Sequence, residues 1–197
     1  MSYGTPEKPK IIACKNHDNM NKHAFSMQEI NDVFKGKGRS QCLLFGSAAV
    51  WVYAKYYSVP HVGLTGVGSD IDLIDPGVNH KYDDTFVSEN GMQCRHIDLV
   101  PRTVVGASMR FPEQFEAMIN VLQVDGYIIR ILSIAALIKA YNARKMLVME
   151  WIDDKSMSDK DEKEIQKIQL KLNILRGVQA IMSTQPAAGG DTAHFKF

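Results

Sequence analysis

The segment Ser69-Asp70-Ile71-Asp72-Leu73-Ile74 constrains the fold of this chain more than any other. Polar and apolar residues alternate in it, which is the pattern of a strand with one face against a core. Side chains two positions apart on a strand face the same way, so Asp70 and Asp72 point together while Ile71 and Leu73 enter the core. Two carboxylates held this close repel each other unless a cation lies between them. Oxygen ligands favour hard divalent cations, so the pattern predicts a Mg2+ or Mn2+ site on this strand.

A second strand and a helix precede this segment. Cys42–Phe45 is a short apolar run, typical of a buried strand. Gly46-Ser47 follows and leads into an apolar segment that is compatible with a helix, Ala48–Tyr57. Glycine lets the backbone come close to a ligand, and a serine that opens a helix presents its hydroxyl and amides to phosphate. The bend at Gly46-Ser47 is therefore a candidate phosphate site.

A third acid lies on a later strand. Residues 85–100 predict a β-hairpin with Asn90-Gly91 at its turn, because Asn-Gly is a strong signal for a short hairpin loop. In the second arm His96 and Asp98 share one face, and the alternate positions are apolar. A carboxylate inside an apolar strand is costly unless it has a partner. Asp98 is therefore predicted as the third acid of the metal site, with His96 on the same face.

The order of strand, Gly-Ser, helix and Ser-Asp-Ile-Asp-Leu resembles the nucleotidyltransferase superfamily that includes DNA polymerase beta. The resemblance runs from about Leu43 to Arg144. Within the superfamily it is nearest to the minimal and abortive-infection-type nucleotidyltransferases of bacterial toxin–antitoxin systems. It implies an α/β (α+β) fold, in which a short mixed sheet is flanked by helices and followed by a C-terminal helical segment.

The resemblance also implies a reaction and a set of site residues. The expected reaction is Mg2+-dependent (or Mn2+-dependent) transfer of a nucleoside monophosphate from an NTP such as ATP to an acceptor hydroxyl, with release of pyrophosphate. The acceptor is a protein, a tRNA or a small molecule, and an antitoxin protein is the expected partner. In LSIAALIKAYNAR, a Lys and an Arg are expected to face the phosphates. The expected residues are Asp70, Asp72 and Asp98 for metal and catalysis, and Gly46, Ser47, Ser69, Lys139 and Arg144 for the nucleotide.

The remaining elements and the domain limits follow from local patterns. Ser26-Met27-Gln28-Glu29 is a capping-box pattern that predicts a helix to about Lys35. Further elements are predicted as a short helix at 111–119, a strand at 126–132, a helix at 134–149 and a last helix from Ser158. We expect the nucleotidyltransferase core at 24–132, the C-terminal helical segment at 133–182 and flexible ends at 1–23 and 183–197.

Composition limits the compartment and the partners. At 197 residues and 45% hydrophobic, the chain can bury one substantial core. Its net charge of +1 excludes a strong overall attraction to nucleic acid. The three cysteines form no Cys-x-x-Cys pair and predict buried thiols in a reducing cytoplasm rather than a disulfide framework. No apolar run is long enough to predict a membrane span.

Two other functions fit the same pattern. The chain could be a catalytically silent nucleotide- or partner-binding module with this fold, because an Asp-x-Asp strand also occurs as a polar strand end. A metal-dependent sugar transferase also uses an Asp-x-Asp pair to hold its metal ion. Binding of NTPs without turnover favours the module, and preference for a nucleotide sugar favours the sugar transferase.

Overall fold

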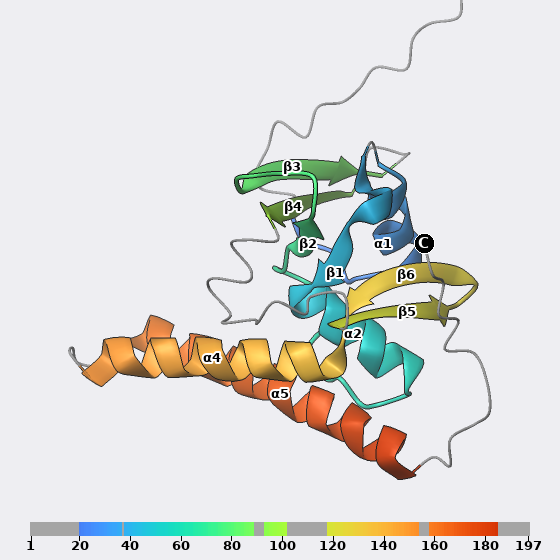
Figure 1. The fold of residues 1–197 in the computed structure, drawn as a ribbon. Helices are drawn as coiled ribbons and strands as arrows, with labels where there is room; N and C mark the ends of the chain where they lie inside the picture. The colour runs from blue at the N-terminus through green and yellow to red at the C-terminus, as the bar shows by residue number, and fades with distance from the viewer. Residues whose placement is uncertain (1–19, 37, 89–92, 102–117, 154–157, 185–197) are drawn as a thin grey trace, which may run out of the picture.

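The computed structural model describes residues 20–36, 38–88, 93–101, 118–153 and 158–184. They form a six-stranded mixed sheet with helices packed on it, and two long helices at the C-terminal end (Figure 1). The strands are β1 (Leu43–Phe45), β2 (Ile71–Asp75), β3 (Tyr82–Val87), β4 (Cys94–Pro101), β5 (Ile119–Val124) and β6 (Tyr127–Leu132). The helices are α1 (Met27–Lys35), α2 (Gly46–Tyr56), α4 (Ile134–Asp153) and α5 (Asp159–Thr184), with a 3-10 turn η2 (Arg39–Gln41). The predicted α/β fold class is confirmed.

The sheet has the strand order β3-β4-β2-β1-β6-β5. β1 is antiparallel to β2 and parallel to β6, and β2 is parallel to β4. β3 and β5 are antiparallel edge strands that pair with β4 and β6. The register of the parallel pair places Asp72 beside Asp98. Two of the predicted acids therefore lie side by side on neighbouring strands.

The central strands and α2 form the core. Ile71, Leu73, Ile97 and Leu99 are fully buried, as the alternating pattern predicts. α2 packs against β1, β2 and α5, and its residues 48–54 are all buried. A helix that is apolar all round has to be enclosed on every side, which explains why α5 covers the side of α2 that the sheet leaves open.

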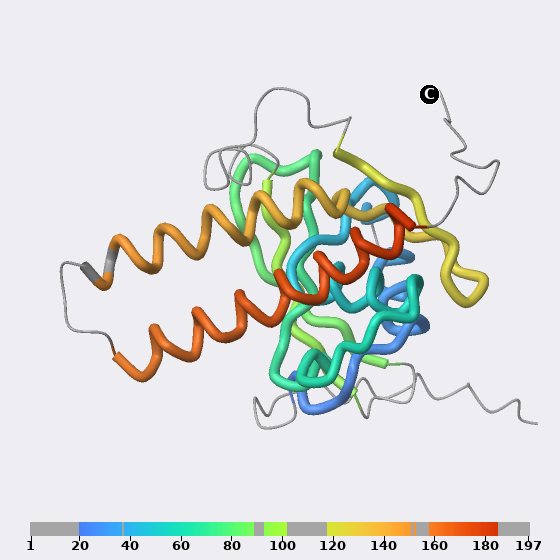
Figure 2. The backbone as a smooth tube through the Cα atoms, turned by 90° about the horizontal axis from the view of Figure 1, so that it is seen from below, coloured from blue at the N-terminus to red at the C-terminus, as the bar shows by residue number. Residues whose placement is uncertain are grey.

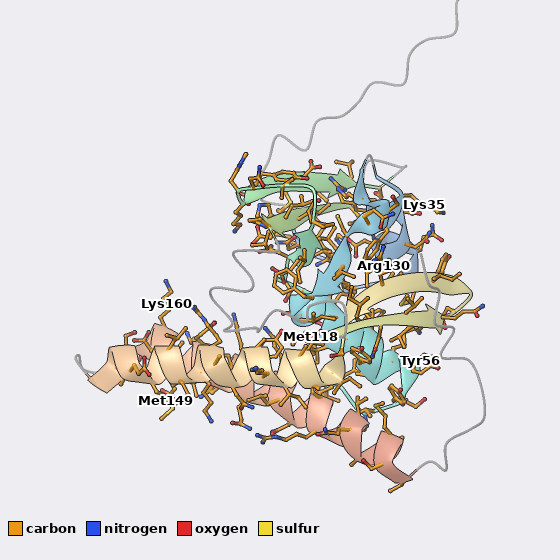
Figure 3. All side chains as sticks on the ribbon, in the orientation of Figure 1. Lys35, Tyr56, Met118, Arg130, Met149 and Lys160 are labelled. Carbon is orange, nitrogen blue, oxygen red and sulfur yellow. The ribbon has the colours of Figure 1, made fainter. Side chains whose placement is uncertain are left out.

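The C-terminal helices form an antiparallel hairpin. α4 and α5 pack along each other and run beyond the edge of the sheet (Figure 2). Met149 and Lys160 lie at the far end of this hairpin, away from the strands (Figure 3). Nearer the sheet, Leu175 and Val178 of α5 enter the main core. Among the described residues, no helix is long and apolar enough to cross a membrane.

Most of the predicted elements are found, and one strand was missed. Ser26 caps α1 as predicted, with its hydroxyl accepting a hydrogen bond from the backbone NH of Glu29 at 3.1 Å. The sequence pattern predicted no strand at β5, which pairs with β6 through the two-residue turn Asp125-Gly126. Both turn residues have positive φ, and an Asp-Gly pair between two apolar-rich segments is the signal that identifies such a hairpin.

Some predictions fall outside the described residues. These are the turn at Asn90-Gly91, most of the helix at 111–119, and the ends at 1–19 and 185–197. Residues 183–184, predicted as part of a flexible end, are the last residues of α5.

The cysteines differ from the prediction. Cys42 is a free thiol, and burial raises its pKa. Cys94 is disulfide-bonded, and its partner lies outside the described residues. The prediction of thiols is therefore wrong for Cys94, because sequence spacing does not reveal which cysteines meet in space.

Candidate metal and nucleotide site

Acidic side chains from three strands gather on one face of the sheet. The pairing register puts Asp72 of β2, Asp98 of β4 and Asp83 of β3 in one row across the sheet. Asp70, just before β2, and His96 of β4 lie next to that row, with 3.5 Å between the Asp70 Oδ2 and the His96 Nδ1. The three predicted acids therefore share a face, and the sheet adds Asp83 and His96 to them.

The Gly46-Ser47 bend lies directly against Asp72. Phe45, the last residue of β1, is the register partner of Asp72. Gly46 has a φ of +67°, and a Cβ added to it would lie 1.9 Å from the Asp72 Oδ2. No side chain fits in that space, so only glycine allows the backbone to turn into α2 at this point. Ser47 is half-buried in the first turn of α2.

The surroundings of Asp72 strongly perturb its carboxyl group. Its pKa is raised to about 7, chiefly by burial and then by the negative charge of Asp98, while Lys171 opposes the shift. Asp70 adds to the same repulsion. A carboxylate crowded in this way is stabilised by a cation, and a divalent ion beside it would restore its charged form. The residues present therefore fit a hard divalent metal.

His96 lies among three carboxylates. Its Nδ1 is 3.6 Å from the Asp98 Oδ1, and its Nε2 is 3.9 Å from the Asp83 Oδ2. Within the described part of the chain, one group of three potential metal ligands has its donor atoms all within 4.8 Å of one another, and it consists of Asp83, His96 and Asp98. The Asp98 Oδ1 is buried and has no hydrogen-bond partner among the described residues. Lys81 binds the other oxygen, with its Nζ 2.9 Å from the Asp98 Oδ2.

Asn21 connects the N-terminal part of the chain to the site. Its side-chain amide donates a hydrogen bond to the Asp70 Oδ1 at 2.5 Å, and its Oδ1 accepts one from the backbone NH of His96 at 3.0 Å. These contacts hold β2 and β4 together where the acids begin. A surface cavity of about 450 Å³ opens beside Asn21. It is lined by Met20, Asn21, Asp70, Asp83, Asp84, Thr85 and His96. No sequence pattern marked Asn21.

Arg95 supports the site from the opposite face of the sheet. It is fully buried, and its Nε lies 2.7 Å from the Oε1 of Glu29 in α1. Its Nη1 donates to the backbone carbonyls of Gly66 at 2.7 Å and Ser69 at 2.6 Å. These bonds fix the loop that leads into Asp70. Arg95 is therefore a positioning residue. No sequence pattern predicted this role, because an arginine in a strand usually faces solvent.

The helical hairpin brings a lysine to the acids. Lys171 of α5 lies with its Nζ 5.1 Å from the centre of the Tyr141 ring of α4. Burial lowers the pKa of Lys171, and the charge of Asp72 counteracts part of that effect. The Tyr141 hydroxyl is buried without a hydrogen-bond partner in the described part of the chain, and burial raises its pKa well above the usual value. No local pattern distinguishes Lys171 from the other lysines of α5, so Lys171 was missed.

Of the other predicted nucleotide-binding residues, Ser69 lies next to the acids, whereas Lys139 and Arg144 lie on α4. Ser69 precedes Asp70, and its carbonyl is held by Arg95. Lys139 is exposed on α4, and the Nε of Arg144 lies 3.6 Å from the Glu164 Oε1 across the hairpin. Among the residues that the structure describes, neither Lys139 nor Arg144 forms an ion pair with the three aspartates.

Comparisons with known proteins give one structural likeness. No family model matches the chain, and no curated protein matches it. Among solved structures, the chain is similar to an antigenic nucleotidyltransferase-like protein from Paracoccidioides brasiliensis, with a TM-score of 0.45 and 11% sequence identity. The likeness covers 81% of this chain and 89% of that chain. The function proposed below therefore depends on the geometry of the site.

Proposed function

We propose that this protein is a metal-dependent nucleotidyltransferase. The observation that carries the proposal is the contact of the Gly46 backbone with Asp72, in the row where Asp72 lies beside Asp98. A phosphate-binding bend and a set of metal-binding acids are the two parts that this chemistry needs within reach of one nucleotide. The sequence separates them, and the pairing of β1 with β2 supports their acting together.

Each part of the site has a role in the proposed reaction. Asp70, Asp72 and Asp98 would hold Mg2+ or Mn2+, and the bound ion would neutralise charge on the triphosphate and on the transferred phosphoryl group. The backbone at Gly46 and the groups of Ser47 would contact the phosphates, with Ser69 beside them. Lys171 adds a cation next to Asp72. The Lys171 ammonium forms no ion pair among the described residues, so it is available to a phosphate. We retain Lys139 and Arg144 as proposed phosphate contacts of the bound state.

The proposed transfer is a nucleophilic substitution at the α-phosphorus. The oxygen of the acceptor hydroxyl forms a bond to the α-phosphorus of the NTP, and the bond from that phosphorus to the bridging oxygen breaks. Pyrophosphate leaves with the electrons of that bond. The hydroxyl proton passes to a nearby carboxylate, for which Asp98 is the proposed acceptor. A protein, a tRNA or a small molecule would supply the hydroxyl, and an antitoxin that blocks the site would make the chain the toxin of a pair.

Labelling with radioactive NTPs tests the proposal. Purified protein is incubated with each α-labelled NTP, Mg2+ or Mn2+ and cell extract, and the label is followed on protein, RNA and small molecules. We expect transfer by the wild type, with a loss of at least about 100-fold in the Asp70→Asn/Asp72→Asn variant, because the metal-held charge is lost. The class of molecule that takes up the label identifies the acceptor.

A matched control is available on the same strand. Asp75 follows at the end of β2, but it points to the other face, where it accepts hydrogen bonds from the Gly77 NH and the Tyr82 hydroxyl. Asp75→Asn should therefore retain transfer. Equal labelling by the wild type and the double variant would refute the assignment of Asp70 and Asp72. Calorimetric binding of NTPs with no label transferred would favour a silent binding module instead.

A further inference from the structure

The metal-binding face contains an imidazole in addition to carboxylates. His96 projects from β4 on the same side as Asp98, and Asp83 is the register partner of Asp98 on β3. The two carboxylates therefore flank the ring from different strands. Imidazole nitrogen is a better ligand for first-row transition metals than for Mg2+, which prefers oxygen and water. The ligand set thus bears on which metal ion the site selects.

The carboxylate oxygen atoms divide between Lys81 and His96. On both carboxylates, one oxygen faces Lys81, whose Nζ is 2.9 Å from the Asp98 Oδ2 and 3.8 Å from the Asp83 Oδ1. The other oxygens face His96, at 3.6 Å for the Asp98 Oδ1 and 3.9 Å for the Asp83 Oδ2. The Lys81 ammonium therefore leaves one oxygen of each carboxylate available beside the ring.

One donor atom from each of Asp83, His96 and Asp98 can be chosen so that all three atoms lie within 4.8 Å of one another. Two atoms bound to the same octahedral ion at about 2.1 Å lie about 3.0 Å apart when adjacent and about 4.2 Å apart when opposite. One ion binds only one nitrogen of the ring, and each nitrogen has a carboxylate oxygen within that interval: the Nδ1 lies 3.6 Å from the Asp98 Oδ1, and the Nε2 lies 3.9 Å from the Asp83 Oδ2. A histidine that binds a metal through one nitrogen commonly presents the other to a carboxylate, and His96 has a carboxylate at both nitrogens.

A second observation also points to a ligand. The Asp98 Oδ1 is removed from solvent and has no hydrogen-bond partner within the described residues, although a buried carboxylate oxygen normally has one. The cavity of about 450 Å³ has Asp83 and His96 in its wall, so an ion can enter from solvent. An ion bound by this oxygen would supply the interaction that the protein does not.

We propose that Asp83, His96 and Asp98 form a transition-metal site that makes the protein select Mn2+ over Mg2+. The proposal deepens the function proposed above, because Asp98 also belongs to the predicted catalytic acids. Any role of this site in catalysis therefore rests on that proposed function. Ion binding itself does not depend on turnover. It can therefore be measured on the resting protein, in the absence of any nucleotide.

Electron spin-echo measurements with Mn2+ test the proposal directly. Mn2+ is titrated into the full chain, and the echo envelope is examined for modulation from a directly bound imidazole nitrogen. We expect this modulation in the wild type and its loss in His96→Gln. Equilibrium titration should show the Mn2+ affinity of His96→Gln lowered at least about tenfold, with a much smaller change for Mg2+. Asp83→Asn, which keeps the imidazole, should lower the Mn2+ affinity and keep the modulation.

Controls make each outcome decisive. His61→Gln removes an imidazole on the connection after α2, where its Nδ1 lies 3.0 Å from the Val59 carbonyl oxygen, and it should leave modulation and affinity unchanged. Absence of nitrogen modulation in the Mn2+-loaded wild type would overturn the proposal even if variants unfold. The same holds if the wild type fails to bind Mn2+. If modulation is present but no NTP transfers its label, the metal site stands and the proposed function fails.

Discussion

Asp72 carries its charge in surroundings that disfavour it, so its protonation is coupled to folding. Its pKa rises from the usual 3.8 to about 7 in the folded chain, because of burial and of Asp98. The folded state therefore holds this proton more tightly than the unfolded state. Metal-free stability should be unaffected by Asp72 below about pH 4, fall as pH rises from about 4 to 7, and then level off.

Replacing Asp72 by asparagine should remove that penalty. In EDTA at pH 8, Asp72→Asn should raise the free energy of unfolding by about 2 kcal/mol, which is less than the full pKa shift implies because Asp72 is partly exposed. The gain should fall below half of that value at pH 5. Urea unfolding at the two pH values measures it, and an equal effect at both would contradict the assignment of the shift to Asp72.

Arg95 and Glu29 form a buried ion pair behind the site, and the Glu29 Oε2 has no hydrogen-bond partner among the described residues. Arg95→Met would leave the buried Glu29 carboxylate without its arginine, with the His23 Nε2 at 2.7 Å from the Oε1 as its remaining side-chain partner. We expect a loss of about 3–5 kcal/mol in the free energy of unfolding, measured with urea. The double variant Arg95→Met/Glu29→Met should recover most of this loss, because it removes both charges. A double variant as unstable as the single one would show that the carbonyl bonds of Arg95, and not the ion pair, dominate.

At the scale of elements, the bend between β1 and α2 is the most specific feature. Gly46→Ala adds a Cβ that cannot be accommodated beside the Asp72 Oδ2 and imposes a positive φ on alanine. Gly38→Ala is the matched control, since Gly38 has a φ of +75° with nothing within 4 Å of the added Cβ. Gly38→Ala should cost about 1–2 kcal/mol from the backbone alone. Gly46→Ala should cost more and should also weaken Mn2+ binding, as measured by unfolding and by titration. Equal costs with unchanged Mn2+ affinity would mean that the bend does not constrain Asp72.

The sequence predicted the elements whose periodicity is strong and missed those defined by pairing. The alternation in β2 and β4 and the cap at Ser26 are local patterns, so they could be recognised directly. β5 was missed although Asp125-Gly126 marks its turn, because the segment before that turn has no strict alternation of polar and apolar residues. The positions of Asn21 and Arg95 depend on contacts with segments distant in sequence, and no local pattern encodes such contacts.

At the scale of the whole molecule, the C-terminal hairpin completes the site. Leu175 anchors α5 in the main core, and Lys171, one turn earlier, lies near Asp72. Its role could not be predicted from the chain, because Lys171 simply continues the three- and four-residue spacing of Lys160, Lys163 and Lys167 along α5. The three-dimensional path of the hairpin determines which lysine meets the acids.

Lys171→Met tests this role. If the ammonium contacts the triphosphate, the variant should bind ATP about tenfold more weakly, equivalent to about 1.4 kcal/mol. Lys160→Met is the control, because Lys160 is an exposed lysine of the same helix at the far end of the hairpin (Figure 3). Calorimetry with Mn2+ present measures both variants. Equal affinity in the two would assign Lys171 to stability alone.

The row of Asp72, Asp98 and Asp83 is drawn from strands that are separate in the chain and meet only when β2 and β3 both pair with β4. No unfolded segment can chelate an ion in this way, so Mn2+ should bind the native state almost exclusively. Each tenfold increase in free Mn2+ above its dissociation constant should then add about 1.4 kcal/mol to the free energy of unfolding. A series of melting temperatures against Mn2+ concentration would thus report how completely these three strands have assembled, before any substrate is known.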